Sequence, residues 1–419
     1  MKAGRLKVII LEIIIYVGLL ISYIFVIAEK YDYMGFIISF DPFKFIIGLV
    51  VFLILIFLSL FVRYGIVWAI WEMIFSLFMV PEIIMFQFAD TSYIQIVSLS
   101  LVLTLLVFVS KIKRKFSGIR RVSNSRQLLT IGSILMFIPF LQFIRYIDLK
   151  NLLLIDVYKT RMLFRNVGDS ITGYLNAPLV RILLPVLVVG SIERKKWKST
   201  FFFLLMILYV YLCGALKSVF MGLIALLIFY RGGYYEKIKY FLNGVGFLTI
   251  AGTIIAKFTG NVFLLDAFVR RVFFVPPYLN DIYNRFFSDN FTYFAQSGVR
   301  FAENDKFSQL SMFVGEHVLG EEGLNANVGT FTEGYISLGF PGLILMAVVI
   351  CLIITFIHMC DIDNRYFGIL FVYIYYFNTS FLTTLLLTHG LSFFLVMCFM
   401  FLRKDKGKKL IEKGERLNG

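Results

Sequence analysis

Twelve apolar segments, separated by shorter polar stretches, dominate the pattern of hydrophobic and polar positions along this chain of 419 residues. Each has roughly 15–25 residues, about what an α-helix needs to cross the hydrocarbon core of a bilayer. The segments are residues 8–28, 44–62, 65–80, 94–110, 128–146, 176–192, 200–214, 217–230, 240–257, 334–357, 366–379 and 382–402. The seventh and eighth, and the eleventh and twelfth, are short enough to form hairpins that cross only partly. The pattern therefore predicts an all-α polytopic membrane protein with a bundle of 10–12 transmembrane helices.

Composition agrees with this fold class. Hydrophobic residues make up 59% of the chain and charged residues 16%, whereas apolar residues are roughly half of an ordinary soluble protein. Segment 8–28 lacks a small-residue cleavage site, so we interpret it as a retained first helix. The cysteines lie in or beside apolar segments without metal or redox spacing, and we interpret them as small buried residues: Cys213, Cys351, Cys360 and Cys398.

The net charge of +15 follows from where the basic residues lie. With the N-terminus inside, most Lys and Arg fall on the cytoplasmic side, in the runs KIKRKFSGIRR, ERKKWK and RKDKGKK. This is the positive-inside bias of membrane proteins. It predicts that both termini are cytoplasmic. It also explains the net positive charge as a consequence of orientation in the lipid bilayer, so no nucleic-acid partner is needed.

Two long loops then face the exterior, at residues 148–176 and 257–333. The predicted organisation is nine helices in residues 1–256, a large external loop in 257–333, three helices in 334–402 and a basic cytoplasmic tail in 403–419. Long loops with little apolar character are typical places for function. The cytoplasmic loops are too short for an ATP-binding domain, and the chain has no phosphate-binding GxxxxGK[ST] sequence.

Arginines in the external loops run against the positive-inside bias. They are Arg161 and Arg165 in the first loop, with Arg181 just inside the next segment, and Arg270, Arg271, Arg285 and Arg300 in the second. Guanidinium groups bind phosphate oxygens bidentately and stay charged when partly desolvated, so the six loop arginines form a predicted pyrophosphate- or glycan-binding set. The alternative is that they snorkel to the headgroups or pair with Asp266, Asp281 and Asp289.

Lys217 is the cation at the outer end of segment 217–230, with apolar runs on both sides. A cation in this position faces a cavity or a partner, or snorkels to the interface, and we include it among the predicted phosphate contacts. In the second loop, His317 and Glu333 are the candidate general bases, with Glu316, Glu303 and Asp305 as alternatives. No HExxH, CxxC or external DxD sequence is present, which predicts chemistry without a metal or cofactor.

Glu12, Glu72 and His389 lie within apolar segments. Ionisable groups in a membrane mark proton or ion relays, or hydrogen bond to a neighbouring helix. We favour the hydrogen-bonding interpretation for Glu72 and His389, while Glu12 lies one turn from the cytoplasmic side.

Two sequences carry a resemblance to a known family. They are NVGTFTEGYISLGFPGLI at residues 327–344 and CGALKSVFMGLIALLIFYRG at 213–232. With the helix number and the arginine-bearing external loops, they resemble the Wzy-type polymerases of O-antigen and capsular polysaccharide, which share a superfamily with O-antigen ligases. The ligases carry a His-Asn pair where this chain has Val328 and Gly329, which favours polymerisation.

The resemblance implies glycosyl transfer between two polyprenyl-pyrophosphate-linked oligosaccharides at the outer face of the bacterial inner membrane. It also implies a chain-length regulator protein as a partner. The alternatives are an O-antigen ligase and a lipid-linked oligosaccharide flippase or transporter. A flippase would place its charges within helices and have short loops on both sides, and a secondary transporter would show two related halves. The large external loop argues against both.

Overall fold

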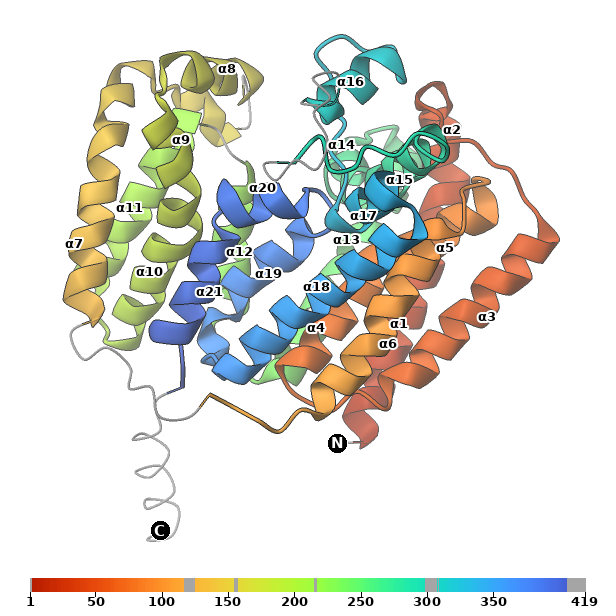
Figure 1. The fold of residues 1–419 in the computed structure, drawn as a ribbon, viewed down its shortest axis with the longest axis horizontal. Coiled ribbons are helices and arrows are strands. Elements are labelled where there is room, and N and C mark those ends of the chain that lie inside the picture. The colour runs from red at the N-terminus through yellow and green to blue at the C-terminus, as the bar shows by residue number, and fades with distance from the viewer. Residues whose placement is uncertain are drawn as a thin grey trace, which may run out of the picture. The chain divides into compact units, whose positions relative to one another are not determined.

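The computed structural model describes residues 2–116, 125–153, 157–214, 217–297, 307 and 309–404. Every regular element in these residues is a helix, with π-helical and 3-10 turns inserted between α-helical stretches (Figure 1). The predicted all-α class is confirmed. The chain divides into two compact units, which are described separately below.

Unit 1 comprises Met1–Lys113, Gly232–Thr355 and Ile374–Thr383. Its elements are α1 (Lys2–Ser22), η1 (Tyr23–Ile27), α2 (Ala28–Lys30), η2 (Asp32–Met34), α3 (Pro42–Ser59), α4 (Ile66–Ile74), η3 (Phe75–Met79), α5 (Val80–Phe88), α6 (Ile94–Lys111), α13 (Tyr234–Thr259), α14 (Phe263–Leu265), η7 (Asp266–Phe274), α15 (Val275–Phe286), α16 (Leu310–His317), α17 (Thr330–Leu338) and most of α18 (Phe340–Cys360). Helix α13 packs along α1, α3 along α5 and α4 along α6. The continuous helix Ile66–Phe88 is buried along its whole apolar window and forms the centre of this unit.

Unit 2 comprises Arg114–Arg231, Phe356–Tyr373 and Thr384–Gly419. Its elements are α7 (Ser125–Phe137), η4 (Ile138–Tyr146), η5 (Leu149–Leu153), α8 (Val157–Val167), α9 (Ser170–Ala177), η6 (Pro178–Leu183), α10 (Leu184–Glu193), α11 (Trp197–Gly214), α12 (Lys217–Ile228), η9 (Asn364–Tyr366), most of α19 (Phe367–Tyr376), most of α20 (Leu382–Leu387) and α21 (Leu391–Met400). Helices α10 and α11 pack along each other, and α8 contacts α11 and η4.

Nine helices in the described part of the chain are long and apolar enough to cross a membrane. They are Gly4–Lys30, Pro42–Ser59, Ile66–Phe88, Ile94–Lys111, Arg126–Tyr146, Ser170–Glu193, Trp197–Gly214, Tyr234–Thr259 and Phe340–Cys360. The three other expected segments form the shorter helices α12 and α19 and the pair α20 and α21. That pair is separated at Gly390, whose φ of +82° is a left-handed conformation that ends a helix. The chain is a polytopic helical membrane protein.

The helix expected from residue 334 begins instead at Phe340, because Gly339 interrupts it with φ +66° and ψ −144°. This backbone conformation is strained for any residue with a Cβ. The chain reverses direction here, and α17 and α18 approach closely at Gly334 and Gly342. A Cβ at Gly334 would lie 2.5 Å from the Gly342 carbonyl oxygen. The glycines of the 327–344 sequence therefore build a tight corner between two helices.

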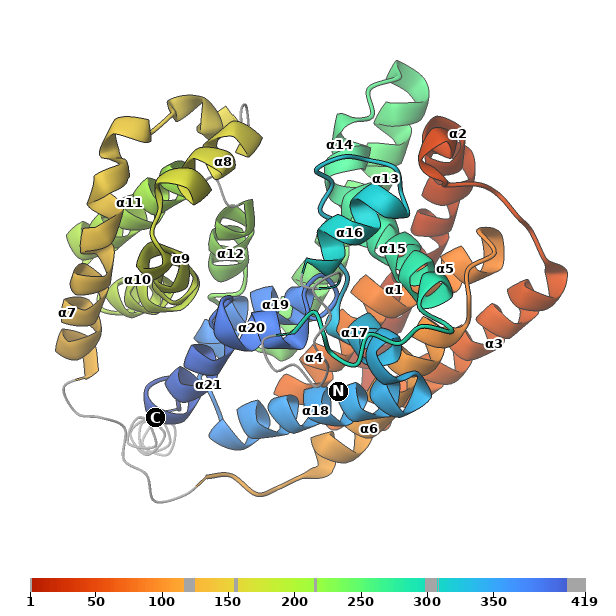
Figure 2. The ribbon, with the colours of Figure 1, turned by 45° about the horizontal axis from the view of Figure 1, so that its top comes forward.

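The large loop folds into a layer of its own within unit 1. Helices α14, α15 and α16 gather at one end of the unit, beside α2 and away from the N-terminus (Figures 1 and 2). A hydrophobic cluster joins α15, α16, α17 and α18, and consists of Tyr283, Phe287, Leu310, Val314, Ala326, Val328, Tyr335, Ile336 and Leu343. The described part of the loop is thus packed onto the start of α18.

Candidate active site

Glu333 occupies the first turn of α17 and is fully buried. Its Oε2 atom accepts a 2.6 Å hydrogen bond from the backbone N–H of Leu382, the first residue of α20. Its Oε1 atom is also buried and has no hydrogen-bond partner among the residues that the structure describes. A buried carboxyl oxygen without a partner is costly, and such groups often have a functional role.

Burial raises the pKa of the Glu333 carboxyl from the ordinary 4.5 to about 7, against the opposing effect of the Leu382 N–H. The cause is desolvation, which disfavours the charged form of an acid. A carboxyl group with a pKa near 7 is about half ionised at neutral pH, which suits a proton acceptor in general base catalysis. The role of Glu333 as a base stays a prediction, and its raised pKa supports that prediction.

The segment 377–382 lies against the start of α17 and contacts Glu333 through the Leu382 N–H. Thr330 fixes this segment to α17, because its N–H donates to the Phe377 carbonyl at 2.8 Å and its hydroxyl to the Ser380 carbonyl at 3.1 Å. Gly329, just before α17, lies so close to Phe377 and Asn378 that a Cβ would overlap their backbone. Gly329 and Thr330 thus hold the segment 377–382 close to Glu333.

A buried chain of hydrogen bonds positions the other side of α17. Asn280 on α15 donates to Glu82 Oε1 on α5 at 2.7 Å, and Thr332 donates to Asn280 Oδ1, also at 2.7 Å. All three side chains are almost completely buried. Glu82 was not predicted as a site residue, because the third predicted segment ends at residue 80. The apolar run that continues to Phe88 was the available signal.

Arg270 and Arg271 are adjacent in sequence but lie in different surroundings. Arg270 is 8% exposed; its Nε donates to Asp266 at 2.6 Å, and its guanidinium stacks on the Tyr31 ring at 4.4 Å. Arg271 is 49% exposed and pairs with the other oxygen of Asp266 at 3.0 Å. Two cations share one carboxylate, which leaves net positive charge here.

Arg285 on α15 is 56% exposed, and its Nε donates to Asp281 at 2.7 Å. Its Nη2 donates to the Asp90 carbonyl, and the Asp90 carboxylate also pairs with Lys44. The pairing with Asp266 and Asp281 that the sequence allowed is therefore present. Phosphate binding by these arginines stays a prediction, and Arg300 lies outside the described residues.

His317 is the last residue of α16 and is exposed. Its ring stacks on Phe313 at 4.7 Å between centroids, and its Nδ1 lies 3.3 Å from the Phe313 carbonyl oxygen. It therefore lies in contact with solvent, unlike the buried Glu333. Its role as a base stays a prediction, and the buried acid is the better-supported of the two candidates.

The remaining predicted cations lie in unit 2. Arg161 on α8 is close enough to Tyr211 on α11 to interact electrostatically, and the Tyr211 hydroxyl donates to the Asn151 carbonyl at 2.7 Å. Arg165 lies on α8 and Lys217 begins α12, but their side chains lie outside the described residues.

Comparisons with known proteins add no family to this description. No family model, no curated protein and no solved structure matches the chain. What the fold establishes is a polytopic helical membrane protein.

Proposed function

We propose that this chain is a glycosyltransferase that polymerises polyprenyl-pyrophosphate-linked oligosaccharide repeat units into O-antigen or capsular polysaccharide. The reaction takes place at the outer face of the bacterial inner membrane, with both chain termini in the cytoplasm. Three features support the proposal: the resemblance of residues 327–344, the folded loop layer away from the N-terminus, and the buried acid at its base. Glu333 is the observation that carries it.

In the proposed reaction, a hydroxyl at the non-reducing end of the incoming unit attacks the anomeric carbon of the growing chain. The bond from that carbon to the pyrophosphate oxygen breaks, and the polyprenyl pyrophosphate leaves with the electron pair. The Glu333 carboxylate takes the proton of the attacking hydroxyl. Because pyrophosphate is a good leaving group, the protein has mainly to position the two substrates and accept this proton.

The half-exposed arginines Arg271 and Arg285 supply positive charge on the loop layer. They would bind the pyrophosphate or the glycan by exchanging their carboxylate partners for phosphate or hydroxyl oxygens. Arg270 is buried between Asp266 and Tyr31, and would hold Asp266 in position instead of binding substrate. No step in this scheme uses ATP or a metal.

Glu333 has no exposed surface in this conformation, so the acceptor hydroxyl reaches it only when segment 377–382 moves. This segment is held by the Leu382, Thr330 and Ser380 hydrogen bonds described above. Substrate binding would displace the Leu382 N–H from Glu333 and put the sugar hydroxyl in its place. Loss of that N–H bond would make the carboxylate a stronger base.

The size profile of surface glycan from cells lacking this protein tests the function. The proposal predicts single repeat units on the final acceptor and no ladder of longer chains, restored by the wild-type gene but not by Glu333→Gln. Long polymer left on the polyprenyl lipid would instead indicate a ligase. An unchanged ladder would overturn the glycan assignment and favour a transporter.

A further inference from the structure

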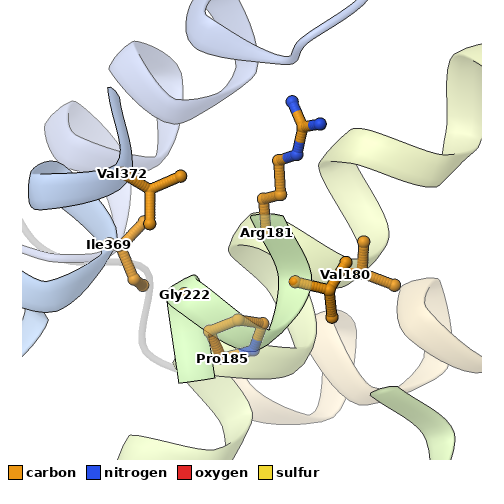
Figure 3. Close-up of a pocket in the computed structure, with 7 residues that line it drawn as sticks. Val180, Arg181, Pro185, Gly222, Ile369 and Val372 are labelled. Carbon is orange, nitrogen blue, oxygen red and sulfur yellow. The ribbon is translucent and has the colours of Figure 1, made fainter. Parts of the chain in front are cut away.

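Ionisable side chains inside apolar helices need a partner, a proton or water, because an isolated charge within a membrane is costly. In unit 2, Arg181 lies beside a hollow with room for about one water molecule. Figure 3 shows the guanidinium there, with Ile369 and Val372 on the facing helix. Such a hollow suits hydration of the cation and is too small for a larger ligand. Unit 1 contains a different arrangement, a pair of acids formed by Glu12 and Glu72.

Glu12 and Glu72 lie inside two membrane-crossing helices of unit 1, Gly4–Lys30 and Ile66–Phe88. At 1.5 Å per residue, Glu12 is about 12 Å beyond the start of its helix and Glu72 about 9 Å beyond the start of the other. Each residue is 1% exposed. Both carboxyl groups are therefore shielded from water and from lipid headgroups.

The two carboxyl groups contact each other between α1 and α4, and their side chains form a hydrogen bond. Two carboxylates offer acceptors alone, so this contact is a hydrogen bond only when one of the groups carries a proton. With both groups ionised, both oxygens of Glu12 and the Oε2 atom of Glu72 are buried without a donor among the residues that the structure describes. Two adjacent buried negative charges would also repel each other. The contact therefore needs a cation between the two acids.

A proton fits this place better than a metal ion. Calcium and magnesium ions take about six or more oxygen ligands. Within the described part of the chain, no group of three or more His, Cys, Asp or Glu side chains is arranged to hold a metal ion. A proton, by contrast, needs one donor oxygen and one acceptor oxygen, and the pair supplies both.

The neighbours of the pair indicate how many protons it holds and where. The Trp68 side chain hydrogen bonds to Glu72, and a donor of this kind stabilises the ionised form of an acid. Arg5 donates to two backbone carbonyls just after α3 and acts on Glu72 as a nearby positive charge. One proton on Glu12 leaves a single negative charge on Glu72, which Arg5 balances.

The other titratable groups on the surrounding helices add little negative charge near the pair. Three of them have partners elsewhere, because Lys44 pairs with Asp90, Lys257 with Glu29, and Glu82 accepts from Asn280. The helices packed around α1 and α4 carry, besides Arg5, Lys7 and Tyr16 on α1, Lys44 on α3, Glu82 on α5, Lys111 on α6, and Tyr234, Tyr235, Glu236, Lys237, Lys239, Tyr240 and Lys257 on α13.

From this geometry we infer that Glu12 and Glu72 form a proton-binding site inside the membrane, in which one exchangeable proton on Glu12 is donated in a hydrogen bond to the Glu72 carboxylate. The proton joins α1 to α4, so its loss would leave two negative charges between these helices. The inference does not depend on the proposed glycan reaction, because the site lies in helices that take no part in that scheme.

The test is infrared spectroscopy of the purified full-length chain in detergent at neutral pH, in H2O and in D2O. The C=O stretch of a protonated carboxyl is separate from the carboxylate bands, and it shifts when deuterium replaces the proton. Glu12→Gln should abolish one such band, because the glutamine N–H then donates to Glu72. Glu72→Gln should keep the band at a changed frequency, because the acceptor becomes an amide oxygen.

Matched variants separate this band from other carboxyl groups and from misfolding. Glu29→Gln removes an exposed acid at the end of the same membrane-crossing helix, paired with Lys257, and should leave the band unchanged. Glu333→Gln identifies the separate band of that acid. The double variant Glu12→Gln/Glu72→Gln keeps a hydrogen bond between two amides, so it should fold, as thermal unfolding would show, and should lack the band.

A protonated-carboxyl spectrum that is the same in the wild type, Glu12→Gln and the double variant would overturn the inference. A band that is lost in Glu72→Gln and kept in Glu12→Gln would place the proton on Glu72 and overturn the assignment to Glu12. A band that appears in the wild type only when sodium is left out of the buffer would mean that a metal ion occupies the site, and would overturn the proton as its occupant.

Discussion

Glu333→Gln should make the protein more stable at alkaline pH, although it removes the proposed catalytic base. The buried carboxyl has a pKa of about 7 in the folded protein against an ordinary 4.5. Each pKa unit corresponds to about 1.4 kcal/mol between the two protonation states, so this difference corresponds to roughly 3 kcal/mol. Glutamine keeps the shape of the side chain and an oxygen for the Leu382 N–H, but it never ionises.

The sign follows from proton linkage. The folded state binds the Glu333 proton more tightly than the unfolded state, so its stabilising effect is complete below pH 4.5. It is lost as the pH rises through about 7. Wild type and Glu333→Gln should therefore be similarly stable near pH 4.5. At pH 8 the variant should be more stable by roughly 3 kcal/mol, which corresponds to roughly 6–12 °C in Tm for a unit of this size.

The assay is thermal unfolding in detergent at several pH values from 4.5 to 8.5, with Thr388→Ala as a control at an exposed hydroxyl of unit 2. The control should show the same pH trend as the wild type. A Glu333→Gln variant that is less stable than the wild type at every pH, with a parallel trend, would contradict the raised pKa of Glu333. It would mean that the carboxylate is ionised and satisfied in the folded protein.

Activity should change with pH in the opposite direction to stability. A base acts in its ionised form, so the rate of polymer formation in the wild type should rise with pH and level off above about 7. A rate that falls between pH 6 and 8 would contradict the assignment of Glu333 as the base.

Two matched pairs of variants test the packing around the site. Arg270→Gln should lower stability by about 2–4 kcal/mol, because it removes a buried guanidinium that pairs with Asp266 and stacks on the Tyr31 ring. Arg271→Gln removes a half-exposed ion pair and should lower stability by less than about 1 kcal/mol. Thermal unfolding measures both variants. Equal losses of stability would contradict the different burial of the two arginines. Asn280→Leu should cost about 1–3 kcal/mol, because it breaks two buried hydrogen bonds. Asn284→Leu, one turn later, should be neutral or stabilising, since the Asn284 amide is buried without a hydrogen-bond partner among the described residues.

The apolar pattern predicted most membrane-crossing helices closely, because crossing depends on the length and summed hydropathy of a segment. The apolar pattern was less accurate where the backbone conformation of a single residue sets the end of a helix. Gly339 delays the start of α18 to Phe340 through its positive φ, and Gly390 separates α20 from α21. A hydropathy average does not register one residue of unusual backbone conformation.

The candidate site was harder to predict, because it depends on contacts between distant residues. The sequence indicates Glu333 as a candidate, but not its hydrogen bond from Leu382, nor the chain of hydrogen bonds that joins the neighbouring Thr332 to Asn280 and Glu82. Arg270 and Arg271 are neighbours of the same type in the sequence, and only packing against Tyr31 distinguishes them. Pattern and composition carry no information on such pairings.

Reconstitution with purified protein tests the proposed polymerase activity itself. Lipid-linked repeat units extracted from cells lacking this protein are incubated with the purified chain in detergent, without nucleotide, and their sizes are measured. With the wild-type protein, lipid-linked products should grow in steps of one repeat unit, and no such products should form with Glu333→Gln. Repeat units that remain single with a folded wild-type protein would contradict the proposed activity.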